Sequence, residues 1–184
     1  LLHALIYALI EIGDVDLLRE ALARSTPAEK RAALIALGQI RGNALTPTET
    51  FAALRSPDAP LRTAALAALR NEEGWGPEAA RFLQWAQEDP AEPWKKEATA
   101  LVMRKLLARA EVQDWLRAYL NNARGRDESN ASAFVQAVAA NPTLWEEAWR
   151  RPLQQAVEQA ALPTARGALE VLAAHKTQEF ALWV

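Results

Sequence analysis

The sequence predicts an all-α protein, built as an α-solenoid of antiparallel helix pairs with about 11 to 13 helices. Three observations lead to this prediction. Apolar residues recur at helical spacing, as Leu2, Leu5, Ile6 and Leu9 do, while strand-like alternation is nearly absent. Prolines stand where helices are expected to begin, because the first helical amide needs no partner. A related segment also returns after about 30 residues, the length of one helix pair.

The first half of the chain carries the clearest helix boundaries. Thr26 with Glu29, and Thr46 with Glu49, form capping-box patterns: each threonine accepts from the third helical amide, and each glutamate reaches back to the cap amide. Gly13 stands where the first helix should end. Helices are therefore expected at residues 1–12, 14–24, 27–40, 47–55, 60–70 and 77–88.

The second half keeps the helical spacing of apolar residues but has fewer cap signals. Asn141 precedes Pro142, which repeats the order of cap and proline seen earlier. Helices are expected here at residues 93–109, 111–122, 128–140, 142–150, 152–161 and 164–175. Because the connecting segments are short, successive helices should pack as antiparallel hairpins.

An internal repeat supports this architecture. Ala21–Leu37 aligns with Ala53–Leu69 at a shift of 32 residues without a gap. Small alanines in the repeat allow neighbouring helices to approach closely, and leucines fill the layer between repeats. We therefore predict a single repeat domain over residues 1–184, with regular repeats over 1–88 and divergent helical repeats over 89–184.

The segment Ser56–Leu69 resembles a HEAT-like repeat, in which a turn with Asp and Pro precedes R-x-A-A-x-x-A-L on the inner helix. The resemblance implies a right-handed solenoid. Arg62 falls in the first helical turn, where a cation gains nothing from the helix dipole. We expect its guanidinium to bond to a nearby acid or carbonyl, with Asp58 as the first candidate.

Three segments carry a sharper resemblance: His3–Asp14, Arg31–Thr46 and Leu61–Gly76. Together they resemble the middle region of planctomycete-type membrane-bound dehydrogenase and haem-binding-domain proteins. That family implies a propeller before this region, a c-type cytochrome domain after it and a periplasmic or extracytoplasmic location. The chain departs from the family pattern at Gly38, where Asp is frequent, and it contains no Cys-x-x-Cys-His motif. The resemblance therefore transfers no functional residue to this segment.

The ends of the chain lead to a related expectation. The sequence starts without Met inside an apolar stretch and closes on "EFALWV", residues 179–184. We therefore expect an internal fragment of a longer protein. No apolar run approaches the ~18 residues that a membrane-spanning helix needs, so no membrane insertion by this segment is expected.

Charge and composition exclude several classes of partner and cofactor. Lys and Arg number 21 against 23 Asp and Glu, so the net charge of −2 creates no overall positive field for phosphates. Nucleic acid is therefore not favoured as a partner. The chain has no cysteine, which excludes disulfides and thiolate metal sites within it.

Catalytic and cofactor residues are not expected in this segment. His3 and His175 are the only histidines and lie at opposite ends of the chain, so they are poor candidates for a metal site or, with Met103, for haem ligation. His175 follows an apolar helix and is expected at its C-terminus. No phosphate-binding glycine loop, Gly-x-Ser-x-Gly or His-Glu-x-x-His pattern occurs, so we predict no catalytic, metal-binding or cofactor-binding residue and no enzyme activity.

Seven tryptophans are the least ordinary feature of the composition. Trp145 and Trp149 lie four residues apart and share a helix face, and Trp75 follows a glycine turn. With Arg62, these three are the candidate residues for binding a partner, because aromatic and arginine side chains dominate interface energetics. The alternative is that the large aromatic rings fill gaps between alanine-rich helices and belong to the core.

The preferred hypothesis is a non-enzymatic interaction or interdomain scaffold module of a larger bacterial redox protein. Its partners would be other domains of the parent chain or another protein. Two alternatives stay open. One is DNA binding like that of HEAT-like DNA glycosylases, for which the chain offers a basic stripe of Arg24, Arg31, Arg55, Arg62 and Arg70. The other is carbohydrate binding through a tryptophan-rich surface.

Overall fold

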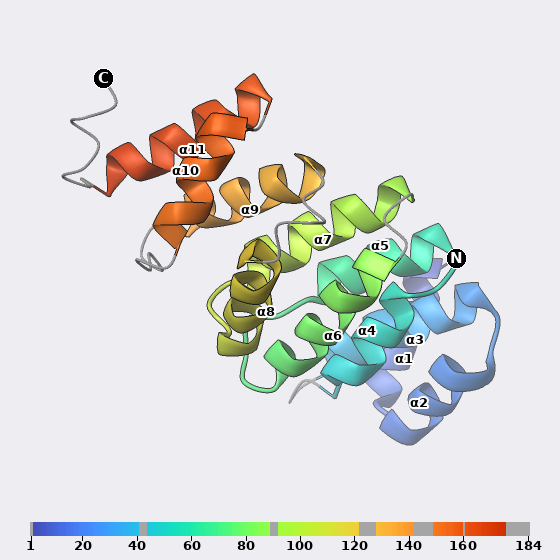
Figure 1. The fold of residues 1–184 in the computed structure, drawn as a ribbon. Coiled ribbons are helices and arrows are strands. Elements are labelled where there is room, and N and C mark those ends of the chain that lie inside the picture. The colour runs from blue at the N-terminus through green and yellow to red at the C-terminus, as the bar shows by residue number, and fades with distance from the viewer. Residues whose placement is uncertain are drawn as a thin grey trace. The chain divides into compact units, whose positions relative to one another are not determined.

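The computed structural model describes residues 2–40, 44–88, 92–121, 128–141, 149–159 and 161–175 (Figure 1). Within these ranges every regular element is helical and no strand occurs, which confirms the all-α prediction. The chain divides into two compact units, Leu1–Arg70 and Asn71–Val184. None of the described helices is both long and apolar enough to cross a membrane.

In its described residues the first unit contains five helices, and two of them begin at the predicted capping boxes. Both capping boxes are formed, by Thr26 with Glu29 and by Thr46 with Glu49. Gly13 follows the first helix with φ 66°, a left-handed conformation that glycine adopts at little cost. The helices are α1 (Leu2–Ile12), α2 (Val15–Arg24), α3 (Pro27–Gln39), α4 (Pro47–Leu54) and α5 (Ala59–Ala68).

Helix α3 forms the centre of the first unit, where it contacts α1, α2 and α5, while α4 packs on α5. Its central position explains why apolar residues surround much of its circumference. Leu34 and Leu37 are fully buried, as are Phe51 and Leu54 of α4. Alanines of α3 are also buried, and their small side chains let the neighbouring helices approach closely.

The second unit contains α6 (Trp75–Glu88), α7 (Pro93–Leu106), α8 (Ala110–Asn121), α9 (Glu128–Ala140), α10 (Arg150–Gln159) and α11 (Leu162–Ala174). Helix α7 contacts α6 and α9, α9 contacts α11, and α10 packs on α11; α6 and α8 also lie in contact. Large side chains fill its core, including Phe82, Met103, Phe134 and Trp149. The rings of Phe134 and Trp149 meet edge to face, with centroids 6.4 Å apart.

Several boundaries in the second unit differ from prediction by one to three residues, and α11 begins at Leu162 instead of residue 164. Helix α6 begins at Trp75, two residues early, because Gly74 with φ 87° completes the turn before it. Helix α7 ends at Leu106 instead of residue 109. Helix α10 begins at Arg150, two residues before the expected start at residue 152. Pro152 is tolerated in its first turn because first-turn amides have no helical partner. Residues 142–148, which carry most of the other predicted helix, lie outside the described ranges.

Polar side chains link segments that lie about one repeat apart, and we call these contacts clamps. Arg70 donates to the carbonyl oxygen of Gly38 at 2.8 Å, and Asn141 donates to that of Arg104 at 3.1 Å. Both acceptors lie in the last turn of a helix, where carbonyls lack a helical partner. Arg70 and Gly38 are 32 residues apart, the same shift that aligns the internal repeat.

Candidate functional site

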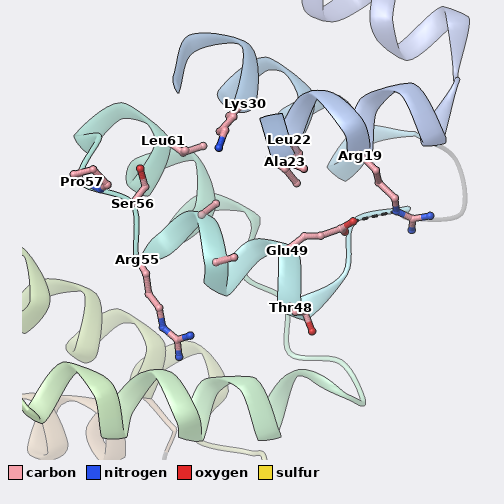
Figure 2. Close-up of a pocket in the computed structure, with 12 residues that line it drawn as sticks. Arg19, Leu22, Ala23, Lys30, Thr48, Glu49, Arg55, Ser56, Pro57 and Leu61 are labelled. Atoms are coloured by element: carbon pink, nitrogen blue, oxygen red, sulfur yellow. Dashed lines mark hydrogen bonds and ion pairs between the residues drawn. The ribbon is translucent and has the colours of Figure 1, made fainter. Parts of the chain in front are cut away.

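A groove of about 560 Å³ lies between α2 and α4 in the first unit (Figure 2). Helix α2 packs on α3 and α4 packs on α5, but α2 and α4 are not among the helix pairs in extensive contact. The beginnings of α3 and α5 complete the walls. The lining residues are Arg19, Leu22, Ala23, Lys30, Thr48, Glu49, Ala52, Ala53, Arg55, Ser56, Pro57 and Leu61.

Small side chains keep this groove open. Ala23 lines it from α2, and Ala52 and Ala53 line it from α4. A methyl group is too short to cross the space between two helices, so the gap is not filled from either side. Leu22 and the buried Leu61 give the groove further apolar surface.

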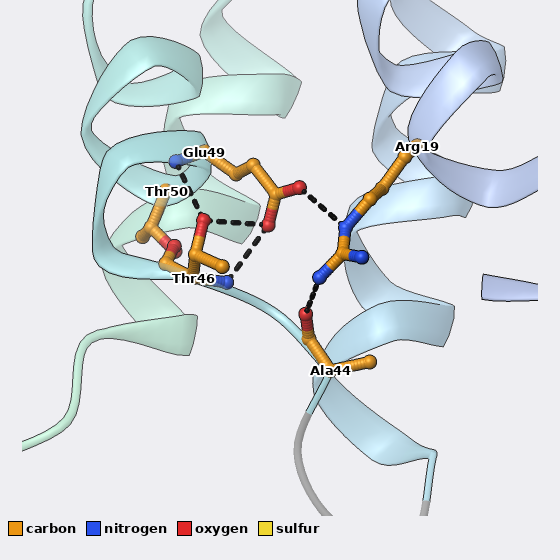
Figure 3. A network of polar contacts seen from close by, with 5 residues as sticks. All are labelled: Arg19, Ala44, Thr46, Glu49 and Thr50. Atoms are coloured by element: carbon orange, nitrogen blue, oxygen red, sulfur yellow. Dashed lines mark hydrogen bonds and ion pairs between the residues drawn. The ribbon is translucent and has the colours of Figure 1, made fainter. Parts of the chain in front are cut away.

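An ion pair bridges the two helices at one end of the groove (Figure 3). Arg19 of α2 donates through Nε to Glu49 Oε1 at 3.0 Å and through Nη2 to the carbonyl oxygen of Ala44 at 3.1 Å. The side chain of Arg19 is 43% exposed and that of Glu49 is 22% exposed. The pair is therefore partly screened by solvent, and its main effect is to fix the distance between α2 and α4.

Glu49 also caps its own helix with the other carboxylate oxygen. Thr46 donates to Glu49 Oε2 from its amide at 2.8 Å and from Oγ1 at 2.7 Å, while the Glu49 amide donates to Thr46 Oγ1 at 3.2 Å. Both oxygens of this carboxylate are thus bound within the protein. These contacts give the Glu49 carboxylate a structural role, both at the start of α4 and in the bridge to α2.

The second capping box provides a comparison without the arginine. Thr26 donates to Glu29 Oε2 from its amide at 2.9 Å and from Oγ1 at 2.8 Å. The backbone hydrogen bond, followed by the hydroxyl hydrogen bond, holds the pKa of Glu29 below its ordinary value of 4.5. No described residue forms an ion pair with Glu29. The two capping boxes therefore differ in one respect: Glu49 is paired with an arginine from another helix, and Glu29 is not.

The groove carries more positive than negative charge. Its lining includes Arg19, Lys30 and Arg55 but only one acid, Glu49. In Figure 2 the Lys30 side chain points toward the interior of the lining set, whereas the Arg55 guanidinium points away from it. Lys30 is half-buried, and its ammonium group makes no hydrogen bond or ion pair with a described residue. Lys30 is therefore the cation that the groove offers to a ligand.

The tryptophans proposed as partner anchors lie mostly elsewhere. Trp75 is 2% exposed and Trp149 is 0% exposed, so both are core residues in this structure. This placement corresponds to the alternative in which the large rings fill gaps between helices. Trp145 lies outside the described residues.

The remaining described tryptophans are half-buried in aromatic clusters. Trp85 lies between Phe82 and Trp94, with centroids 5.6 and 5.9 Å away, and Lys95 Nζ is 4.6 Å from the Trp85 ring. Trp115 and Tyr119 of α8 stack at 5.3 Å. No described tryptophan is strongly exposed, so the tryptophans of the described ranges form no open platform for a sugar.

Arg62 holds the turn before its own helix. Its Nη1 donates to the carbonyl oxygens of Ser56 at 2.9 Å and Pro57 at 2.7 Å, which confirms the expected carbonyl bonding. Asp58, the first candidate for its partner, instead caps α5 by accepting from the Leu61 amide at 2.7 Å. Arg62 thus orders the groove wall formed by Ser56 and Pro57.

Two further arginines of the expected basic stripe are engaged inside the first unit. Arg24 pairs with Glu20 at 3.2 Å, and Arg70 clamps Gly38. With Arg62 also bound to carbonyls, three of the five stripe members bind groups of their own unit. This arrangement does not favour phosphate binding by the stripe.

The histidine and methionine expected to be structural have packing roles where they are described. His175 follows α11 and its Nδ1 lies 2.8 Å from the carbonyl oxygen of Val171, as expected for a residue at a helix C-terminus. Met103 is 1% exposed. The described ranges contain no group of three or more His, Cys, Asp or Glu residues able to hold a metal ion. The His3 side chain lies outside the described set.

Sequence reasoning found Glu49 as a capping residue but did not single out Arg19 or Lys30. Arg19 and Glu49 are 30 residues apart, about one repeat period. A search for opposite charges at that spacing would have found the pair. For Lys30, the sequence carries no signal beyond its position one turn into α3.

Compared with protein-family models, curated proteins and solved structures, the chain shows no significant match to any of them.

Proposed function

We propose that this chain is a non-enzymatic protein-interaction module, built as an α-solenoid of HEAT-like helix pairs. The observation that carries the proposal is the groove between α2 and α4, which combines an apolar lining with the ammonium group of Lys30, for which no described residue is a partner. A concave, largely apolar surface with few polar groups is typical of a binding site.

Two features of the helix packing support the solenoid part of the proposal. In each unit the odd-numbered helices form a row of contacts: α3 contacts α1 and α5 in the first unit, and α9 contacts α7 and α11 in the second. Such contacts between every second helix are expected when helix pairs stack in one direction. The Arg70 clamp also joins residues separated by 32 positions, the shift that aligns the internal repeat.

The chemistry of the groove supports binding over catalysis. Its one carboxylate, Glu49, is held by Arg19 and Thr46, and the described lining contains no histidine to act as a base for its hydroxyl groups. A side chain activated for nucleophilic or acid–base chemistry needs such a partner. The groove can therefore select a ligand by shape and charge without transforming it.

The proposed setting is the helical middle region of a larger bacterial redox protein, as the resemblance of three N-terminal segments implies. Reading the complete coding frame tests this setting. We expect a propeller-encoding region upstream and a Cys-x-x-Cys-His motif downstream. A frame that lacks both would overturn the redox setting and leave the interaction module to be judged by binding alone.

The interaction function is tested by titrating the 184-residue chain with separately produced domains from the same frame, using isothermal calorimetry. We expect saturable binding to at least one domain. If the chain binds none of these domains but binds duplex DNA at low salt, the DNA alternative replaces the proposal. If it binds none of them and oligosaccharides quench its indole fluorescence, the sugar alternative replaces it.

A further inference from the structure

We infer that the groove between α2 and α4 binds a short acidic peptide segment that also carries an apolar side chain. This inference rests on the proposed function, since it names the chemistry of the partner. The segment would place a carboxylate beside Lys30 and an apolar side chain against Leu22, Ala52 and Leu61.

Charge is the first argument. The chain as a whole has a net charge of −2, but the groove lining holds three cations and one acid. Arg19 and Glu49 neutralise each other at one end. Lys30 is then left as a half-buried ammonium group without a described partner, in surroundings that strengthen its attraction to an anion. A carboxylate is the group that this position recognises.

The apolar lining is the second argument, because it selects against a simple inorganic anion. Leu22, Ala23, Ala52, Ala53 and Leu61 together give the groove more apolar than polar surface. A free phosphate or a nucleic acid backbone would leave this surface without contacts. A peptide supplies a carboxylate and an apolar side chain from neighbouring positions.

The dimensions fit a segment of a few residues. Helix α4 has 8 residues, which at about 1.5 Å per residue gives a wall about 12 Å long. An extended chain advances about 3.3 Å per residue, so about four residues span that wall. The volume of about 560 Å³ lies within the range of sites that enclose small ligands.

Ser56, in the turn between α4 and α5, adds a second polar group to the lining. Its Oγ accepts a hydrogen bond from the Asp58 amide at 3.1 Å, so its position is fixed while its hydroxyl proton can still be donated. Arg62 holds the same turn through the Ser56 and Pro57 carbonyls. A donor of this kind suits a peptide carbonyl or a second carboxylate.

The test uses fluorescence anisotropy of a fluorescein-labelled peptide of alternating Glu and Leu with the 184-residue chain at low ionic strength. A matched peptide with Gln in place of Glu separates charge from apolar contact. We expect the acidic peptide to bind about tenfold more tightly than the Gln peptide, and Lys30→Gln to remove most of that difference. Arg24→Gln is the control, since it removes the same charge from an exposed site outside the groove.

A second pair of variants tests the location. Ala52→Leu places a larger side chain into the groove from an exposed position and should weaken binding at least tenfold with an unchanged helical circular dichroism spectrum. Ala28→Leu, on an exposed position of α3 outside the lining, should have no effect.

Three results would each overturn the inference. The two peptides could bind equally, or the Lys30→Gln or Ala52→Leu variant could bind the acidic peptide as tightly as the original chain. A DNA duplex could also bind more tightly and displace the peptide. The chain could instead bind other domains encoded in the same reading frame, with Ala52→Leu leaving that binding intact. The proposed function would then stand, but the groove would not be the binding site.

Discussion

At the scale of single residues, Glu49 serves two partners from different helices. One oxygen caps α4 through Thr46 and the other binds Arg19 of α2. Because Arg19 is nearly half exposed, we expect only a modest contribution from this ion pair. A double-mutant cycle of Arg19→Met and Glu49→Gln, measured by urea unfolding, should give a coupling free energy of about 0.2–1 kcal/mol. Glu29→Gln paired with Arg19→Met should show no coupling, since Glu29 has no described cation partner. Equal coupling in both cycles would contradict the bridge.

Glu29 provides a prediction about pH. Its folded-state pKa lies below the ordinary value of 4.5, because the Thr26 amide and hydroxyl bind the carboxylate. The stabilisation is therefore fully present above pH 4.5 and is lost as the pH falls through the lower folded-state pKa. Thr26→Ala should raise the pKa of Glu29 toward 4.5, as measured by NMR titration of its side-chain carboxyl carbon. An unchanged titration would show that the capping box does not hold this charge.

Trp149 illustrates the difference between a core and a surface aromatic residue. It is fully buried and its ring meets Phe134, so Trp149→Ala should lower the free energy of unfolding by about 3–5 kcal/mol. Trp115→Ala, on a half-buried ring, should cost less. Urea denaturation followed by circular dichroism measures both. A loss below about 1 kcal/mol for Trp149→Ala would be incompatible with its burial.

At the scale of helices, two glycines allow a direct test of packing. A Cβ on Gly167 of α11 would lie 3.0 Å from Val135 Cγ1 of α9, whereas one on Gly38 of α3 would lie 3.7 Å from Leu45 Cδ2. Gly38→Ala should therefore stabilise by about 0.5–1 kcal/mol through helix propensity. Gly167→Ala should cancel that gain and destabilise by about 1 kcal/mol, because buried Val135 must move. Thermal unfolding of both variants decides whether α9 and α11 approach this closely.

Most helix boundaries follow from local chemistry, which is why the sequence predicts them. Thr26 and Thr46 fix the starts of α3 and α4, and Gly13 fixes the end of α1. The start of α6 at Trp75 was missed because the left-handed φ of Gly74 depends on the turn that surrounds it. The start of α10 at Arg150 was missed because a helix was expected to begin at residue 152, where a proline stands.

The candidate site was harder to predict, because it depends on contacts between helices. The Arg19–Glu49 bridge joins residues 30 positions apart, and helical periodicity carries no information about such a pair. Conversely, tryptophan is a frequent anchor at interfaces, so Trp75 and Trp149 attracted attention that their burial does not support. Composition alone does not distinguish a core aromatic residue from an interface one.

At the scale of the whole molecule, the seven tryptophans all lie in residues 71–184. Indole fluorescence therefore reports the second unit, while circular dichroism at 222 nm reports helices of both. Since each unit has its own buried core, we expect the two signals to give different urea midpoints.

Coincident midpoints and slopes would contradict this expectation and show that the two units unfold together. Phe51→Trp offers a matched probe, because it places an indole in the core of the first unit. The larger side chain overpacks this core and lowers the stability of the first unit. A fluorescence transition at a lower urea concentration than that of the unsubstituted chain would therefore arise from the first unit.

The Arg70 and Asn141 clamps end on backbone carbonyls, not on side chains. A carbonyl is present at every position whatever residue occupies it. Substitutions at the acceptor positions can therefore accumulate while the clamp survives, provided that the helix end keeps its shape. Only the donor position of each clamp requires a particular side chain. The clamps therefore tolerate substitution at the acceptor residues and are lost by substitution of the donor residues.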